Sequence, residues 1–292
     1  MLADDIIITG SRAVANSYAK INLTLDVLGK REDGYHDVKM IMQTVSLSDL
    51  VLIDKAHEDI SISTNLRFLP NNEKNIAYLA AREFFDYTQI RSGCKILIHK
   101  NIPVAAGLAG GSGNAAAVLS ALNMLYNTQL TTEELCNIGV KLGADVPYCI
   151  TGGTALAEGI GEKITHLPPL GKAVILMVKP AINISTASIY QAIDNEDIPK
   201  HPDTDAMLWA INNGDIETVA KNLFNVMGYV TEKLHPIIKG IRRKMMINGA
   251  LGAVMSGSGP TVFGIFPDYS TAKKAHDSFA YQFKEVFIVS TK

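Results

Sequence analysis

A glycine-rich stretch between a strand-like and a helix-like segment constrains this chain more than any other feature. Residues 103–117 read Pro-Val-Ala-Ala-Gly-Leu-Ala-Gly-Gly-Ser-Gly-Asn-Ala-Ala-Ala. Apolar residues alternate before it over 94–100 and recur at helical spacing after it over 115–125. Glycine lets a ligand approach the backbone closely, and a helix start offers unpaired N–H groups and the positive end of the dipole. The stretch therefore predicts an anion site, most often one for phosphate.

Two known phosphate-binding motifs compete with this interpretation, and so does a flexible loop without a ligand. A Walker A loop ends in Gly-Lys-Ser or Gly-Lys-Thr, and the sequence contains neither triplet. Residues 111–116 match the dinucleotide fingerprint G-x-G-x-x-A in letters, but they lie well past the end of the expected strand. Glu133 and Glu134, about twenty positions further on, open an expected helix instead of ending a strand. A dinucleotide-binding oxidoreductase is therefore kept only as an alternative.

The composition is that of an ordinary globular chain. Its 292 residues are 47% hydrophobic and 19% charged, which allows a sizeable core and two lobes. The net charge is −2 and lysine and arginine form no block, so we expect neither a nucleic-acid nor a membrane partner. The 3 cysteines show no metal-ligand spacing, and no apolar stretch approaches about 18 residues. We expect a cytoplasmic protein, and both a monomer and a homodimer remain open.

Polar residues that could carry chemistry lie near the N-terminus. Residues 18–28 alternate as a half-buried strand, which places Lys20 and Asn22 on the same polar face. Tyr35 and His36 follow an Asp-Gly turn and could serve a heterocyclic base, with a ring for stacking and an imidazole for its edge. From these residues alone, a solvated lysine and an ordinary surface turn remain the simpler interpretations.

Asp145 lies in an unusual place for a carboxylate. It follows a helix expected over residues 131–142, which Gly143 should end. The dipole at a helix C-terminus is negative, so Asp145 needs a cationic partner, and Lys20 could be that partner. Transfer of a phosphoryl group to an alcohol needs donors around phosphate, a cation and a carboxylate for the acceptor proton. The sequence offers residues 103–113, Lys20 and Asp145 for these three roles.

The remaining periodicity predicts an α+β chain with two lobes. The expected strands and helices of the first half cover 37–45, 50–55, 60–63, 75–88 and 154–158. In the second half they cover 173–178, 185–193, 203–212, 234–248, 252–255, 262–266, 271–279 and 286–290. Apart from the inserted helices over 185–212, the second half has the β-α-β-β-α-β order of a ferredoxin-like fold. We expect a β-rich α/β lobe with the glycine-rich stretch over 1–165 and a ferredoxin-like lobe over 166–292.

Five segments together resemble one enzyme family. They cover residues 19–23, 33–36, 103–117, 142–147 and 256–259. In this order the chain resembles the galactokinase, homoserine, mevalonate and phosphomevalonate kinase superfamily essentially end to end. Asp-Gly-Tyr-His and Gly-Ala-Asp-Val-Pro are similar to the branch that phosphorylates a cytidine diphosphate-linked methylerythritol. The resemblance implies a two-lobed small-molecule kinase fold, ATP and Mg²⁺ as cofactors, and transfer to the 2-hydroxyl in the methylerythritol phosphate route to isoprenoid precursors.

The resemblance also implies roles for single residues. Lys20 and Asp145 would form the catalytic pair, with Asp145 deprotonating or orienting the hydroxyl and Lys20 keeping it ionised. ATP would bind along Pro103, Val104, Ala105, Ala106, Gly107, Leu108, Ala109, Gly110, Gly111, Ser112 and Gly113, with Asn75 near the adenine. The sequence shows no complete set of Mg²⁺ ligands, and Ser112 at the expected helix start is a candidate ligand. Gly113 replaces a second polar residue common in the family, so we expect weaker ATP binding but retained activity.

For the substrate, the resemblance implies a base subsite. Cytosine would stack between Tyr35 and Tyr190, with His36 at its edge. Asn22 and Thr186 would contact other polar groups. Mevalonate or homoserine kinase activity is an alternative, but neither acceptor has a base for the Asp-Gly-Tyr-His turn to stack. A nucleotide-binding module without activity is a further alternative, and an intact Lys20/Asp145 pair argues against it.

Overall fold

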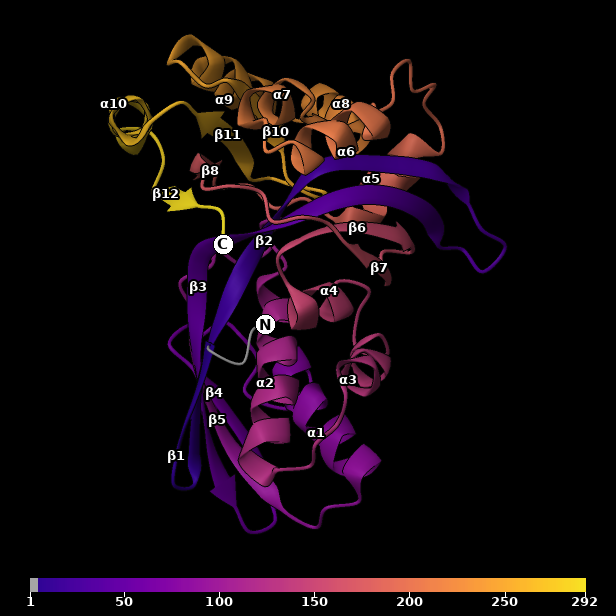
Figure 1. The fold of residues 1–292 in the computed structure, drawn as a ribbon, viewed down its shortest axis with the longest axis vertical. Coiled ribbons are helices and arrows are strands. Elements are labelled where there is room, and N and C mark those ends of the chain that lie inside the picture. Colours follow the sequence, from indigo (N-terminus) through magenta and orange to yellow (C-terminus); the bar gives the residue numbers. More distant parts are fainter. Residues whose placement is uncertain (1–4) are drawn as a thin grey trace. The chain divides into compact units, whose positions relative to one another are not determined.

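A computed structural model describes residues 5–292 (Figure 1). Residue contacts divide the chain into two compact units, each built from separate stretches of sequence. Of the described residues, unit 1 contains 5–19, 47–104 and 109–152, and unit 2 contains 20–46, 105–108 and 153–292. The glycine-rich stretch thus contributes to both units. The division of the chain between residues 165 and 166 stays a prediction.

Strands and helices occur throughout the described residues 5–292. The strands are β1 (Ile6–Thr9), β2 (Arg12–Lys30), β3 (His36–Ala56), β4 (Ile60–Thr64), β5 (Gly93–His99), β6 (Thr154–Gly159), β7 (Lys163–His166), β8 (Val174–Lys179), β9 (Phe224–Asn225), β10 (Gly252–Met255), β11 (Val262–Phe266) and β12 (Glu285–Ser290). The helices are α1 (Ile76–Thr88), α2 (Gly110–Tyr126), α3 (Thr132–Gly139), α4 (Val146–Thr151), α5 (Thr186–Ile193), α6 (Thr204–Asn212), α7 (Ile216–Lys221), α8 (Val226–Leu234), α9 (Pro236–Ile247) and α10 (Tyr269–Ala280). None of these helices in residues 5–292 combines the length and the apolar character needed to cross a bilayer.

Unit 1 packs helices against strands around an apolar core. Strand β5 pairs antiparallel with the second half of β3 and parallel with β4, and β1 forms an antiparallel pair with the start of β2. Helix α2 is a run of alanine, valine and leucine that is apolar around most of its circumference, so it is buried on most sides. Helices α1, α3 and α4 pack with it (Figure 1), and Phe84, Ile96 and Leu119 lie in the shared core.

Unit 2 contains the ferredoxin-like arrangement. Its four-stranded sheet has the order β10-β11-β8-β12, and every neighbouring pair is antiparallel. Helices α9 and α10 pack on this sheet. Because the elements follow as β8-α9-β10-β11-α10-β12, with α5 to α8 inserted after β8, the predicted β-α-β-β-α-β fold is confirmed. In the same unit, β6 pairs with the first half of β3 and β7 pairs with β6.

One expectation about the strands is wrong. The two strands expected over 37–45 and 50–55 are a single strand, β3, of 21 residues. Asp49 lies between the two expected strands, and it is fully buried and hydrogen-bonded within unit 1. A buried carboxylate with partners can lie inside a strand, because its polar atoms no longer need water.

Candidate functional site

The glycine-rich stretch has the backbone conformation of an anion site. Helix α2 begins at Gly110, and its N-cap, Ala109, is left-handed (φ 54°) with no side chain capping the helix. Ala105 (φ 51°) and Gly107 (φ 74°) are also left-handed. Left-handed alanine is strained by about 1–2 kcal/mol, and such strain concentrates at ligand sites. The first turn of α2 therefore presents backbone N–H groups and the positive end of its dipole to a ligand.

In unit 2, the middle of this stretch is held by the segment 256–261. The Ser256 hydroxyl donates to the carbonyl of Gly107 (3.0 Å). A Cβ on Gly107 would lie 2.3 Å from the Ser256 carbonyl oxygen, so only glycine allows this approach. The Ser256 hydroxyl oxygen also accepts from the Asn22 backbone N–H (3.3 Å), and the Lys20 N–H donates to the Leu108 carbonyl (3.2 Å). Strand β2 and two distant loops thus meet within unit 2.

Lys20 is not a solvated surface lysine. Lys20 is only 4% exposed, and its ammonium donates a hydrogen bond to the Asn22 Oδ1 (2.8 Å). Asn22 is fully buried, and its amide nitrogen lies 3.2 Å from the Met40 sulfur. A buried ammonium needs hydrogen-bond partners or opposite charge, so its burial indicates a defined role.

Asp145 lies at the beginning of a helix, which corrects the expectation from the sequence. Helix α3 ends at Gly139, and Asp145 is the N-cap residue of α4, with Pro147 in its first turn. The chain turns early because α4 packs closely on α3: a Cβ on Gly139 would lie 2.8 Å from Val146 Cγ1. Asp145 is therefore at the positive end of a helix dipole, where a carboxylate is stabilised. Asp145 belongs to unit 1 and Lys20 to unit 2, and their pairing stays a prediction.

The expected base subsite forms a cluster in unit 2. His36, 8% exposed, stacks on the Tyr190 ring with centroids 4.4 Å apart and planes 17° apart. His36 Nε2 lies 2.7 Å from Asp194 Oδ1, and the Lys30 ammonium donates to Asp194 Oδ2 (2.8 Å). The Tyr35 residue is 60% exposed. The structure thus brings His36 and Tyr190 together, and Tyr190 stacks on the histidine.

Sequence reasoning missed Asp194 and Lys30. The hydrogen bonds from His36 and Lys30 hold the pKa of the Asp194 carboxyl below its ordinary value of 3.8. Asp194 follows Tyr190 by four residues at the end of α5, a spacing that places both on one helix face. The four-residue spacing was the sequence signal for Asp194. A side chain that stacks on Tyr190 also comes within reach of Asp194, because both lie on the same helix face.

Two further candidate residues have local partners. The Thr186 hydroxyl, in the first turn of α5, lies 2.8 Å from the Ser258 hydroxyl. Asn75 caps α1, since its Oδ1 accepts from the Ala77 N–H (3.0 Å) and its amide donates to the Pro70 carbonyl (2.9 Å). The Asn75 side chain is therefore already used in structure, and its place near an adenine stays a prediction.

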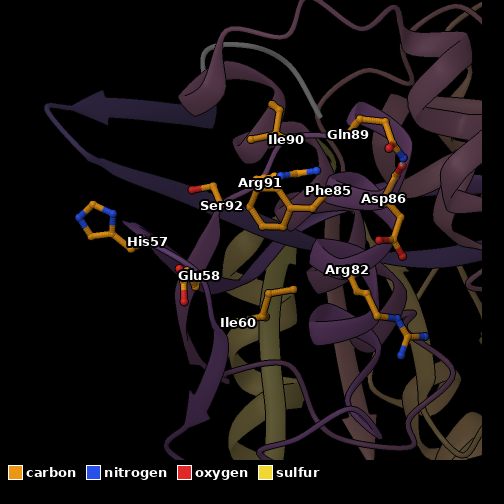
Figure 2. A pocket seen from close by; sticks show the side chains of 10 residues that line it. All are labelled: His57, Glu58, Ile60, Arg82, Phe85, Asp86, Gln89, Ile90, Arg91 and Ser92. Carbon is orange, nitrogen blue, oxygen red and sulfur yellow. Dashed lines mark hydrogen bonds between the residues drawn. The ribbon is translucent and has the colours of Figure 1, made fainter.

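Unit 1 has a pocket that is lined by other residues than the candidate site residues described above. Figure 2 shows its lining, which comes from the turn before β4, from α1 and from the segment before β5. Its volume is about 610 Å³, and it contains none of the site residues predicted from the sequence. The lining contains two arginines, Arg82 and Arg91, and two acids, Glu58 and Asp86, so it has no strong excess of either charge. In residues 5–292 no group of three or more His, Cys, Asp or Glu side chains has the arrangement of a metal site.

Comparisons with known proteins agree on one family. The models described as GHMP kinases N terminal domain and GHMP kinases C terminal match residues 75–153 and 207–285. A 4-diphosphocytidyl-2-C-methyl-D-erythritol kinase of Alkaliphilus metalliredigens is 49% identical over 276 residues, covering 94% of this chain and 95% of the relative. One from Clostridium perfringens is 50% identical over 278 residues, covering 94% and 96%. The chain belongs to the 4-diphosphocytidyl-2-C-methyl-D-erythritol kinase family.

Solved structures agree with this family. A crystal structure named 4-(cytidine 5'-diphospho)-2C-methyl-D-erythritol kinase has a TM-score of 0.83 and 30% identity, covering 95% of this chain and 98% of that chain. A mevalonate kinase of L. major, solved with R-mevalonate, has a TM-score of 0.75 at 16% identity, covering 99% and 97%, and shares the fold. Membership in the 4-diphosphocytidyl-2-C-methyl-D-erythritol kinase family confirms the predicted fold class and kinase class. The oxidoreductase alternative has no support.

The Asp194 cluster makes stability depend on pH. A carboxyl whose pKa is lowered on folding stabilises the fold above its unfolded pKa, and this contribution is lost as the pH falls through the lower folded value. We expect Asp194→Asn to unfold at lower urea than the wild type at pH 6, and the difference to shrink as the pH falls towards 3. Asp197→Asn, a nearby exposed carboxylate, is the control and should show no such convergence. A constant gap between pH 6 and pH 3 would contradict this role of Asp194.

Proposed function

We propose that this chain transfers the γ-phosphate of ATP to the 2-hydroxyl of 4-diphosphocytidyl-2-C-methyl-D-erythritol, forming the 2-phosphate and ADP. The relatives that carry this enzyme name match over 94% of the chain. The observation that carries the proposal is the buried ammonium of Lys20, whose backbone is bonded to the glycine-rich stretch at Leu108. A fixed cation beside a phosphate-binding backbone is what phosphoryl transfer requires, because the reaction depends on positioning and on charge stabilisation.

ATP would bind through the backbone of residues 103–113. The left-handed residues Ala105, Gly107 and Ala109 and the uncapped start of α2 support a phosphate site there. Asn75 would lie near the adenine. Mg²⁺ would bind mainly through ATP phosphates and water, as it does in many kinases, with the Ser112 hydroxyl as a candidate ligand. The ion would neutralise charge on the transferred group.

Asp145 and Lys20 would act on the hydroxyl. Asp145 would accept the proton of the 2-hydroxyl, or orient it, as the oxygen attacks the γ-phosphorus. Asp145 lies at the N-terminus of α4, as its N-cap residue. Lys20, held by Asn22, would stabilise the charge that develops on the phosphoryl oxygens.

The cytidine would bind near Tyr35. Its exposed ring offers a face for stacking, and His36, held by Asp194, would meet the edge of the base. Cytosine would stack between Tyr35 and Tyr190, and His36 already covers one face of the Tyr190 ring. Asn22 and Thr186 would contact other polar groups of the substrate. The enzyme would work in the cytoplasm, in the methylerythritol phosphate route to isoprenoid precursors.

The test of this function is a coupled assay of ADP release with Mg-ATP. Diphosphocytidyl-methylerythritol, mevalonate and homoserine are compared at equal concentrations. We expect turnover with the cytidine substrate alone, because only that acceptor has a base for Tyr35. Turnover with mevalonate or homoserine instead would support the kinase reaction but contradict the proposed cytidine acceptor. No ADP release with any of the three would contradict the proposed function.

Replacing Asp145 tests the proposed base. Asp145→Asn keeps the shape of the side chain but removes its ability to accept a proton, so kcat should fall by about 10²- to 10⁴-fold. ATP and substrate should still bind, which calorimetry measures. Asp205→Asn, on an exposed position of α6, is the matched control and should keep wild-type kcat. An Asp145→Asn enzyme as fast as the wild type would disprove this role.

Replacing Tyr35 tests the proposed base stacking. Tyr35→Ala should weaken binding of the cytidine substrate by about 1–3 kcal/mol, or roughly 5- to 150-fold, the usual scale of stacking on an aromatic ring. The KM for ATP should not change. Tyr281→Ala removes a ring that is 92% exposed elsewhere in unit 2 and serves as the control. An unchanged Kd for the cytidine substrate in Tyr35→Ala would refute this placement.

A further inference from the structure

A fully buried carboxylate lies within unit 1. Asp49, in the middle of β3, is 0% exposed. It forms an ion pair with Lys100, whose side chain is 6% exposed, and it accepts from the backbone N–H groups of Asn101 (2.7 Å) and Ile102 (2.8 Å). Its other oxygen also accepts from the Asn114 amide (2.9 Å). A buried charge is tolerated only with such a complete set of partners.

These partners lie at both ends of residues 103–113, the part of the glycine-rich stretch to which ATP is assigned. Lys100, Asn101 and Ile102 immediately precede residue 103, and Asn114 immediately follows residue 113. The Lys100 ammonium also donates to Asn114 Oδ1 (2.9 Å), which closes a triangle of three side chains. The Asp49 carboxylate therefore bonds to the chain segment before residues 103–113 and to the segment after them.

The first turn of α2 packs directly on this network. A Cβ on Gly110 would lie 3.2 Å from the Lys100 ammonium and 3.1 Å from Ile102 Cγ2. The Asn114 amide donates to the Ser17 hydroxyl (3.0 Å), and a Cβ on Gly113 would lie 2.8 Å from that hydroxyl oxygen. The backbone of the first turn is therefore held against the network with no room to shift inward.

We propose that Asp49 is a positioning residue for the nucleotide, acting through Lys100 and Asn114 on both ends of the glycine-rich stretch. The inference rests on the proposed function, which assigns ATP to this stretch. Charge-assisted hydrogen bonds are among the strongest in proteins and have narrow geometry, so they fix the spacing of the two ends. A backbone held in its binding conformation loses less freedom when phosphate binds, which favours ATP binding.

The decisive variant is Asp49→Asn. Its oxygen can still accept from Asn101 and Ile102, but its amide would face two other donors, the Lys100 ammonium and the Asn114 amide. We expect the KM for ATP to rise about tenfold, while kcat and the KM for the cytidine substrate stay within about twofold. Amide hydrogen exchange over residues 103–113 should be faster than in the wild type even without nucleotide.

A matched control lies on the same strand. Asp54 is a surface carboxylate of β3 that pairs with Arg12 (2.7 Å), and its side chain is 36% exposed. Asp54→Asn makes the same chemical change and should keep the wild-type KM for ATP. If Asp49→Asn does not fold, the double variant Asp49→Asn/Lys100→Met removes both buried charges at similar volume. It should fold and still raise the KM for ATP about fivefold or more, because the ends of the stretch are no longer tied.

A purely structural role for Asp49 would give a different result. The melting temperature of a folded variant would then fall, but its KM for ATP and the exchange of residues 103–113 would stay within twofold of the wild type. That result would overturn the inference and leave the proposed function intact. If the wild type fails to bind Mg-ATP in calorimetry, the proposed function fails and this inference with it.

Discussion

The interaction on which the candidate site depends is the pairing of polar side chains that folding has removed from water. Lys20 is buried and bonded to Asn22, and Asp49 is buried and bonded to Lys100 and Asn114. Both sets contact the glycine-rich stretch or its ends. In an apolar interior each of these groups alone would strongly destabilise the fold, so each arrangement is formed completely or not at all. The part of the glycine-rich stretch before α2 has no regular secondary structure, and these contacts give it a defined backbone conformation.

Most of the fold could be predicted because its apolar pattern is regular. The ferredoxin-like sheet of unit 2 follows from short apolar strands separated by two amphipathic helices, in an order that permits few pairings. The start of a helix within the glycine-rich stretch could also be predicted from the helical spacing that follows it, whereas phosphate binding by residues 103–113 stays a prediction. Burial of Lys20 could not be predicted from alternation, because what covers the polar face of a strand comes from elements distant in sequence.

The errors have a common physical cause. The two strands expected over 37–45 and 50–55 omitted Asp49, and Asp145 was expected just after a helix that Gly143 ends. In the structure Asp49 has partners from β5 onward, and Asp145 begins α4 because α4 packs tightly on Gly139 of α3. The contact between His36 and Tyr190 is equally non-local, because the two residues are 154 positions apart in the sequence. Tertiary partners decided each case, and no local pattern contains them.

The left-handed alanines in the glycine-rich stretch have a consequence for the conformational freedom of this loop. Ala105 and Ala109 adopt a conformation that glycine would adopt without strain. Glycine at either position would relieve the strain, but it would also allow the unbound loop many more conformations. Alanine restricts the conformations of the unbound loop, but its left-handed backbone costs about 1–2 kcal/mol at each position. A motif defined by its glycines alone therefore overlooks two residues that limit the motion of the loop.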